Sequence, residues 1–323
     1  MASEIYSRQE LIIGKEAQKK LEKSKVCIVG VGGTGSAVAE LLGRAGVSLT
    51  LIDRDIVEKS NLGRQILYSE KDIGNLKALS ARKNILSANP VVKIEAVNDE
   101  LNTENAEKLL GSDLIIDCTD NMAARFLINE VSLKKKIPWI YTGAIKNEGL
   151  VAIFSGMGNP CFRCMVPRVP KAGSLEICST SGVLGPLPSV VGSITARKTI
   201  EILLEGPENG SLLKIGENFE NLQIKGREWC DTCRKEFPIL EGRENLNNSI
   251  QFCGAIVLKS DIPFSEAKKR IKKNSKIISS SNTVIVTEYK KSRIIILKSG
   301  KIIFRNLKTK KEANIIYSKL IGN

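Results

Sequence analysis

The chain has 323 residues, a net charge of +14 and an apolar content ordinary for a soluble protein. That length predicts about two domains and is sufficient for a sizeable core. No apolar run reaches the roughly 18 residues that a membrane helix needs, and the N-terminal segment lacks the apolar core of a secretion signal, so we expect a cytoplasmic protein with no membrane partner. Histidine is absent. Any chemistry must therefore use carboxylates, Lys, Arg, Cys or a bound metal, and histidine bases and Ser-His-Asp triads are excluded.

The first half of the chain alternates predicted strands with predicted helices. Short apolar runs indicate buried parallel strands, and segments with helical spacing separate them. We expect strands at 26–29, 48–52, 91–97, 113–117 and 139–142, and helices at 8–23, after the glycine turn at 30–35, at 76–88, at 104–110 with Thr103 as its cap, and at 122–135. This alternation predicts an α/β, Rossmann-like domain with a mostly parallel sheet.

The alternation of predicted strands and helices ends after Gly143. The next strand is expected at 150–154, after a short turn. Because so short a connection joins only antiparallel strands, it predicts an antiparallel extension of the sheet. Beyond it we expect a polar loop at 166–181, a long helix at 189–205, strands at 212–215 and 219–224, and a linker at 239–249.

The remaining residues predict a small, separate α+β module. Strands are expected at 255–258, 283–288, 293–297 and 301–305, and helices at 264–273 and 309–321, with Ser299-Gly300 as a hairpin turn. The predicted domains are therefore 1–243 and 248–323. Residues 249–323 contain 17 Lys and Arg against 4 Asp and Glu, which leaves the rest nearly neutral. This excess indicates either a solvated lysine-rich surface or a docking surface for an acidic protein or RNA.

The stretch 25–65 has the order strand, glycine turn, helix, strand, acid, which is typical of nucleotide-binding βαβ units. The glycines of the turn at 30–35 let the backbone approach a phosphate, and the helix N-terminus adds a positive dipole end. Asp53 lies where an acid accepts hydrogen bonds from ribose hydroxyls. The glycine turn alone fits NAD enzymes as well as ATP enzymes.

Charged side chains that follow this stretch favour a triphosphate. Arg64 and Lys77 can neutralise phosphate oxygens, Arg as a planar fork and Lys as a point charge. Asp120 comes just after a predicted parallel strand, where open α/β sheets bind ligands, and its carboxylate can hold Mg²⁺.

Four of the eight cysteines form two C-x-x-C pairs, Cys161 with Cys164 and Cys230 with Cys233. Paired C-x-x-C motifs in a chain without a secretion signal indicate zinc rather than disulfides, and four thiolates suffice for one structural Zn²⁺. Cys27 and Cys118 lie in apolar strands and are interpreted as core residues. Cys178 belongs to neither group, because it lies in the polar loop before the long helix.

Together these motifs resemble the ThiF/MoeB/HesA family, whose members adenylate ubiquitin-like modifiers and sulfur-carrier proteins. The resemblance covers about residues 5–240 and rests on Y-S-R-Q at 6–9, G-x-G-G-x-G, D-x-D, N-L-x-R-Q, Lys77, C-T-D-N at 118–121 and the two C-x-x-C pairs. It implies an ATP site formed by Gly32, Gly35, Asp53, Asp55, Asn61, Arg64, Gln65, Lys77 and Asp120.

The resemblance also implies a reaction and partners. The C-terminal glycine carboxylate of a small β-grasp protein ending in Gly-Gly attacks the α-phosphate of ATP, and pyrophosphate leaves. Arg8 reaches the ATP of a neighbouring subunit, which requires a homodimer. Cys178 is either a nucleophile that forms a covalent link to the activated carrier, as a thioester or acyl disulfide, or a spare thiol. We expect no sulfurtransferase domain of the kind that some relatives append, and the basic module matches none of the family's extra domains.

Three alternatives stay open at this point. A relative that adenylates a tRNA-borne carboxylate is favoured by the basic C-terminal residues, although the two zinc motifs argue against it and a nucleic-acid partner is not our main expectation. An NAD-dependent oxidoreductase rests on the glycine turn alone. A non-catalytic zinc scaffold would have no need of Arg64, Lys77 and Asp120.

Overall fold

The structure, a computed structural model, describes residues 2–169, 181–244, 255–280, 282–290, 292–305, 307 and 309–322. The predicted nucleophile Cys178 lies outside the described residues. The chain divides into two compact units near residue 249. Each unit has its own sheet and core.

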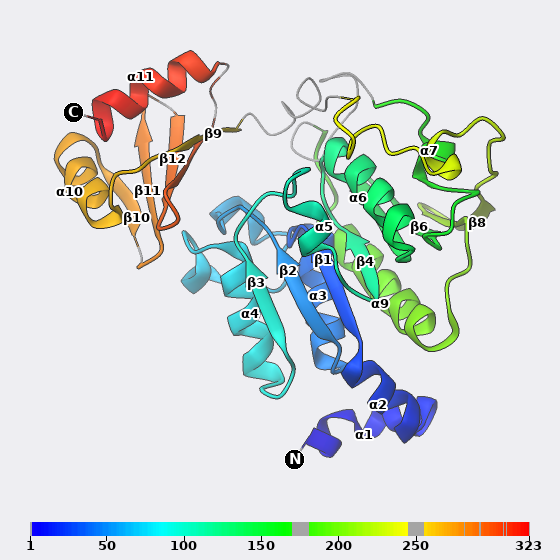
Figure 1. The fold of residues 1–323 in the computed structure, drawn as a ribbon. Helices are drawn as coiled ribbons and strands as arrows, with labels where there is room; N and C mark the ends of the chain where they lie inside the picture. The colour runs from blue at the N-terminus through cyan, green and yellow to red at the C-terminus, as the bar shows by residue number, and fades with distance from the viewer. Residues whose placement is uncertain are drawn as a thin grey trace. The chain divides into compact units, whose positions relative to one another are not determined.

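The larger unit is built on an eight-stranded sheet with the order β3-β2-β1-β4-β5-β6-β7-β8 (Figure 1). The pairs from β3 to β5 are parallel, and those from β5 to β8 are antiparallel. The strands are β1 (Lys25–Val29), β2 (Ser48–Ile52), β3 (Ile94–Val97), β4 (Leu114–Asp117), β5 (Trp139–Ile145), β6 (Glu148–Phe154), β7 (Ser211–Ile215) and β8 (Phe219–Gln223). The predicted parallel sheet with an antiparallel extension is confirmed.

Helices cover both faces of this sheet. Side chains alternate along each strand, so Val26 and Ile28 of β1 face the core under α3, α4 and α9, whereas Cys27 and Val29 face α5 and α6. The helices are α1 (Ala2–Ile13), α2 (Lys15–Lys23), α3 (Gly33–Arg44), α4 (Lys77–Ala88), α5 (Ala106–Leu109), α6 (Met122–Lys135), α7 (Phe162–Met165) and α9 (Leu187–Glu205), with short 3-10 turns η1 (Lys59–Asn61), η2 (Glu70–Asp72) and η3 (Thr232–Arg234).

Two helix predictions need correction. The single helix expected at 8–23 is two helices, because Gly14 has a φ of 82° and interrupts the chain between them. The helix expected at 104–110 is only Ala106–Leu109, and its N-cap residue is Asn105 rather than Thr103. The Asn102 side chain accepts hydrogen bonds from the amides of Glu104 and Asn105, so these residues form a turn ahead of the helix.

The smaller unit is an antiparallel sheet with the order β10-β11-β12-β13-β9. Its elements are β9 (Ala255–Lys259), α10 (Phe264–Asn274), β10 (Ile277–Ser280), β11 (Val284–Tyr289), β12 (Ser292–Leu297), β13 (Lys301–Arg305) and α11 (Lys310–Leu320). Its core joins Ile294 and Phe304 of the sheet to Ile271 of α10 and Ile316 of α11. Gly300, with a φ of 83°, forms the predicted hairpin turn, whereas β10 was not predicted. In the described part of both units, no helix has the length and apolar character needed to cross a membrane.

Candidate active site

The predicted nucleotide-binding residues follow neighbouring parallel strands. Gly30 comes directly after β1, Asp53 after β2, and Cys118 to Asp120 after β4. Because β1 pairs in parallel with both β2 and β4, the carboxyl ends of these strands lie at one edge of the sheet. This is the edge at which open α/β sheets bind ligands.

Neighbouring backbone atoms lie so close to part of the glycine turn that they leave no room for side chains there. The Gly30 amide donates to the Ile52 carbonyl oxygen at 2.8 Å, with a φ of 87° that favours glycine. A Cβ at Gly35 would lie 2.0 Å from the Gly30 carbonyl oxygen, so only glycine permits this contact. At Gly32, the N-cap residue of α3, the nearest atom to such a Cβ is the Gln65 amide nitrogen at 3.9 Å. The turn is thus closed toward the sheet and more open at Gly32, beside the first turn of α3.

Asp53 connects this turn to the segment after β2. One carboxylate oxygen accepts from the Val31 amide at 2.8 Å and the other from the Asp55 amide at 2.7 Å. Burial raises the pKa of the Asp53 carboxyl, and the nearby Lys77 opposes that rise. A carboxylate has about four lone-pair positions, so these two bonds leave capacity for ribose hydroxyls.

Lys77 begins α4 and lies beside Asp55. Its amide donates to the Asp55 carbonyl oxygen at 2.8 Å, and its Nζ lies 3.5 Å from the Asp55 carboxylate. The Lys77 side chain is largely buried. A buried ammonium at this edge favours an anionic ligand, because it lowers the cost of placing negative charge there.

The segment 61–68 carries the next group of predicted contacts. Asn61 accepts from the Glu58 amide at 3.1 Å, and Arg64 donates to the Ser60 carbonyl oxygen at 3.0 Å while remaining half-buried. Gln65 is only 2% exposed, and its side-chain oxygen has no hydrogen-bond partner within the described chain. An unpartnered buried amide oxygen is costly, and a ligand donor at this edge would satisfy it.

Tyr68 was not predicted, yet it connects two parts of the site. Its hydroxyl lies 2.8 Å from the Val31 carbonyl oxygen and 3.3 Å from the Lys77 carbonyl oxygen. Burial raises the pKa of Tyr68 far above its usual range, so the hydroxyl stays a neutral donor. Sequence periodicity could not reveal this role, because the polar stretch 54–75 has no regular pattern.

Asp120 is exposed at the carboxyl edge, on the turn between β4 and α6. The neighbouring Asp117 is fully buried and forms an ion pair with Arg125 at 3.2 Å. Neither Asp117 nor Arg125 was predicted. The only hint in the sequence was the position of Asp117 at the end of an apolar run.

Arg8 lies away from the other predicted residues. Tyr6 of the same helix packs against Gly46, where a Cβ would lie 2.8 Å from the tyrosine ring, and its hydroxyl accepts from the Asn89 side chain at 2.9 Å. Gly46 precedes β2, so α1 lies at the amino edge of the sheet. A five-residue strand spans about 16 Å, which separates the exposed Arg8 from the glycine turn of its own chain.

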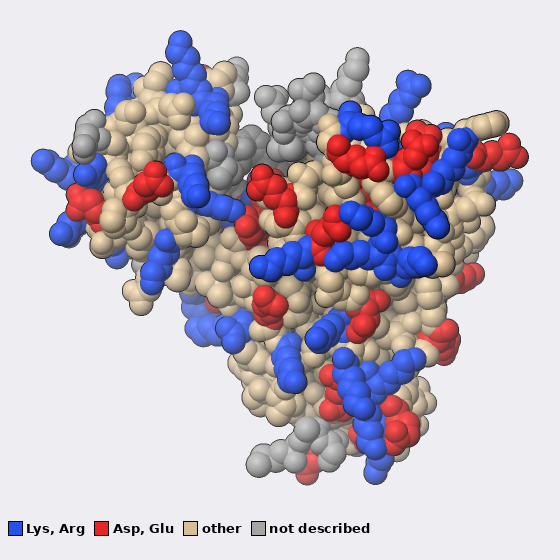
Figure 2. Space-filling model, in the orientation of Figure 1, with Lys and Arg blue, Asp and Glu red and all other residues tan. Residues whose placement is uncertain are grey.

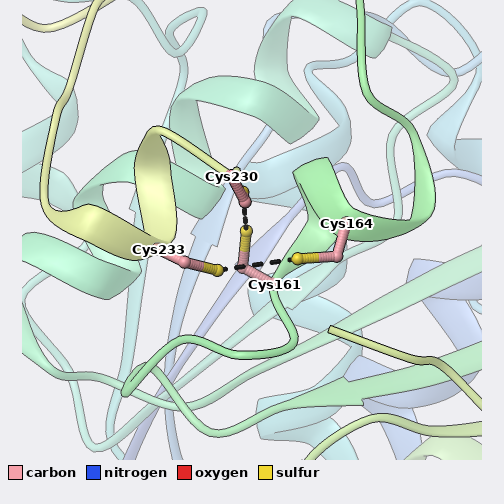
Figure 3. A group of neighbouring side chains, drawn as sticks. All are labelled: Cys161, Cys164, Cys230 and Cys233. Atoms are coloured by element: carbon pink, nitrogen blue, oxygen red, sulfur yellow. Dashed lines mark hydrogen bonds between the residues drawn. The ribbon is translucent and has the colours of Figure 1, made fainter. Parts of the chain in front are cut away.

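The four C-x-x-C sulfurs come together, all within 4.8 Å of one another (Figure 3). Cys161 to Cys230 and Cys164 to Cys233 are both 3.6 Å apart. Four thiolates about 2.3 Å from a tetrahedral zinc lie about 3.8 Å from one another, so the group fits Zn²⁺. The Asn159 amide donates to the Cys233 sulfur at 3.2 Å, and the Asn129 side chain lies 3.7 Å from that of Cys161. Such donors stabilise metal-bound thiolates.

Two other cysteines are unsuited to nucleophilic roles. Burial raises the pKa of the Cys27 thiol to about 12 and raises that of Cys118 further. Cys27 also points into the core between β1 and α6. These observations support the interpretation of Cys27 as a core residue, whereas Cys118 is half-buried and lies just beyond the end of β4.

The strand order and glycine turn define a Rossmann-like domain, and the thiol cluster could hold a metal ion. The sequence matches the ThiF family over residues 6–234, so the chain belongs to that family. The resemblance noted in the sequence is thereby confirmed.

Two relatives match this chain over most of their own length. The sulfur carrier protein adenylyltransferase of Thermus thermophilus is 36% identical, over 72% of this chain and 90% of that protein. The SAMP-activating enzyme E1 of Haloferax volcanii is 35% identical, over 71% of this chain and 87% of that protein. Both comparisons extend over less than three quarters of this chain.

Solved structures support the fold. The crystal structure of E. coli MccB with ATP superimposes with a TM-score of 0.62 over 71% of this chain and 74% of that one, at 20% sequence identity. At this identity the comparison establishes the architecture alone.

Proposed function

We propose that this chain is an ATP-dependent adenylyltransferase that activates the C-terminal glycine carboxylate of a small ubiquitin-like or sulfur-carrier protein. The observation that carries the proposal is the set of groups at the carboxyl edge of the sheet. An open glycine turn at Gly32, the buried ammonium of Lys77 and the exposed carboxylate of Asp120 lie on adjacent elements there. The family match and the names of the two relatives point to the same chemistry.

In this proposal the residues position ATP and neutralise its charge. Asp53 holds the ribose, the turn at Gly32 and Gly35 receives the phosphates, and Arg64 and Lys77 bind phosphate oxygens, with Asp55, Asn61 and Gln65 completing the site. The carrier carboxylate is already ionised, so its attack on the α-phosphorus with loss of pyrophosphate requires no enzymic base. The absence of histidine is therefore compatible with the reaction, and positioning and electrostatic stabilisation suffice.

Mg²⁺ is assigned to Asp120, because an exposed carboxylate is the oxygen ligand that this ion prefers. When bound, the ion would neutralise charge on the phosphates of ATP. Zn²⁺ is assigned to the four-cysteine group as a structural ion that holds α7 and the segment around η3 together.

The direct test is ATP–pyrophosphate exchange with purified carrier proteins that end in Gly-Gly, followed by intact-mass analysis. Exchange that depends on the terminal glycine carboxylate is expected, and an adduct that disappears in Cys178→Ser would identify Cys178 as a nucleophile. Absence of exchange with every such carrier of the source organism would contradict the proposal. Exchange that requires tRNA would favour a tRNA-linked carboxylate instead, and saturable NAD binding with hydride transfer would favour an oxidoreductase.

A homodimer is the second part of the proposal, because Arg8 cannot reach the site of its own chain. The exposed side chains of α1 include Leu11 at 76% and Ile12 at 86%, close to Arg8. An apolar surface of this kind around a basic residue suits a protein interface. In the dimer, Arg8 would act at the ATP of the partner subunit.

A complementation experiment tests this arrangement. Arg8→Ala and Asp120→Ala are each expected to abolish exchange, and refolding the two inactive chains together at equal ratio should restore about one quarter of wild-type activity, since half of the dimers then carry one complete site. Lys15→Ala on the neighbouring helix serves as a control that should keep full activity. If the mixture stays inactive although mixed dimers form, Arg8 does not act across the interface.

The proposal assigns 1–243 to adenylation and 248–323 to recruitment of an acidic carrier. In the smaller unit, Lys and Arg predominate on the face seen in Figure 2. Four exposed lysines of α10, Lys268, Lys269, Lys272 and Lys273, have no carboxylate within ion-pair distance in the described chain. No aromatic side chain of this unit is exposed among the described residues, so the stacking surface of single-strand binders is lacking.

Reversal of these four lysines to glutamate should raise the KM for the carrier at least about tenfold at low salt, with little change in kcat, because charge steering of the encounter is lost. The effect should shrink as ionic strength rises. A matched variant with Lys83, Lys93, Lys108 and Lys225 changed to glutamate carries the same charge change on the larger unit. Equal KM values for the two variants would remove the recruitment role.

A further inference from the structure

One guanidinium, that of Arg125, stabilises the turn that carries Asp120. Arg125, on the second turn of α6, is 13% exposed, and its Nε donates to the fully buried Asp117 carboxylate at 3.2 Å. Its Nη2 donates to the Thr119 carbonyl oxygen at 2.6 Å. The guanidinium also lies over the Tyr141 ring, 4.8 Å from its centroid. A single side chain thus joins the end of β4, the turn, the start of α6 and strand β5.

The other bonds of the turn lead back to the same carboxylate. Asp117 also accepts from the Thr119 amide at 3.0 Å and from its hydroxyl at 2.7 Å, so three donors surround it. Asn121 caps α6 through the Ala123 amide at 2.9 Å, and the Thr119 hydroxyl lies 3.3 Å from the Asn121 amide. Asp120 is therefore held between two residues whose side chains are both fixed, while its own side chain is exposed.

The electrostatics require Arg125 at this position. Burial alone would lower the pKa of the guanidinium, but Tyr141, Asp117 and Asp120 outweigh it and the net shift is upward. A buried carboxylate without its partner would be strongly unfavourable. Arg125 thus faces the carboxylates of both Asp117 and Asp120, and of these two only Asp120 is exposed to a cation from solvent.

We propose that Arg125 is a positioning residue for the metal-nucleotide site. By binding Asp117 and Thr119, Arg125 fixes the conformation of the 117–121 turn and thereby orients Asp120. It does not touch the nucleotide. This inference rests on the proposed function, in which Asp120 holds Mg²⁺. Only a planar fork makes both bonds at once, so a lysine keeps the charge but cannot make both.

The test compares Arg125→Lys with Arg163→Lys in the full-length chain. Arg163 is a matched control, because its side chain is 11% exposed, lies 3.6 Å from the fully buried Glu130 and covers the Phe126 ring at 5.0 Å. It belongs to the zinc-binding end of the unit and not to the 117–121 turn. Both replacements should lower the melting temperature, but only Arg125→Lys should alter the proposed Mg²⁺ site at Asp120.

Mn²⁺ binding in the presence of a non-hydrolysable ATP analogue, followed by the EPR signal of free Mn²⁺, is the first readout. Arg125→Lys should weaken Mn²⁺ binding by about tenfold or more, as is typical of residues that orient a metal ligand, while Arg163→Lys should bind like the wild type. Hydrogen exchange of the amides at 119–121, measured without ligand, should be faster in Arg125→Lys alone. Thr119→Val, which removes one bond to Asp117, should shift both readouts in the same direction.

The outcomes separate the two proposals. Equal Mn²⁺ affinity in Arg125→Lys and wild type, or an equal loss in Arg163→Lys, would overturn the positioning role. If the wild type binds no Mn²⁺ with the nucleotide analogue, the metal assignment of the proposed function fails. In that case unchanged exchange at 119–121 in Arg125→Lys would overturn the positioning role independently.

Discussion

Replacement of Asp120 by asparagine should lower ATP–pyrophosphate exchange by about 100-fold or more, with little loss of stability. The residue is exposed, so its replacement leaves no cavity, and the largely buried Arg125 that it faces keeps its ion pair with Asp117. Its proposed contribution is to hold a cation against the phosphates, and single electrostatic contacts to a transition state are worth about 10²–10³ in rate. Initial exchange rates over a range of Mg²⁺ concentrations, with melting temperatures measured in parallel, would check this.

A carboxylate at the other end of the same strand provides the control. Asp113 precedes β4 and accepts from the Lys25 amide at 2.8 Å, so it lies at the amino edge of the sheet. Asp113→Asn changes the net charge equally and should retain nearly full exchange. If both variants lose activity equally, the effect comes from charge or stability, and the assignment of Asp120 fails.

The parts of the fold that were predictable are those that local sequence determines. Buried parallel strands appear as continuous apolar runs, so β1, β2 and β4 were predicted to within a residue at each end. Helix α6 was predicted at its observed ends because its capping signals are local: Asn121 caps the first turn, and Lys136 takes a left-handed conformation after the last. Strand β10 was missed, since I-I-S-S is too short for a clear alternation.

Prediction of the site was limited for a different reason. Motif spacing made Asp53, Lys77 and Asp120 candidates because each begins a regular element or follows one within three residues. The roles of Tyr68 and Arg125 depend on contacts between segments distant in the chain, such as Tyr68 with Val31 or Arg125 with Tyr141. No periodicity records such contacts. The position of Arg8 at the amino edge likewise became apparent only from the packing of Tyr6 against Gly46.

Loss of the proposed zinc ion should be the most damaging single change to stability. The two C-x-x-C pairs are about 65 residues apart in sequence and join α7 to the segment at η3. Next to them, Phe162 packs among Phe126, Trp139 and Phe154, so the metal motif is continuous with the main core. Without the metal, three buried thiols and the half-buried thiol of Cys233 would have to share this space without a common partner. Structural zinc contributes on the order of 10 kcal/mol of apparent binding free energy.

Cys161→Ser should therefore reduce bound zinc below one ion per chain and lower the melting temperature by roughly 10 °C or more. Metal analysis by mass spectrometry and thermal unfolding would measure both, and chelation of the wild type should reproduce the loss until zinc is restored. Cys27→Ala is the comparison, because that buried cysteine lies in the core away from the four sulfurs and its truncation costs packing alone. It should lower stability while keeping one zinc per chain. A Cys161→Ser protein that retains full zinc content and stability would show that the four sulfurs gather without serving as the metal's ligands.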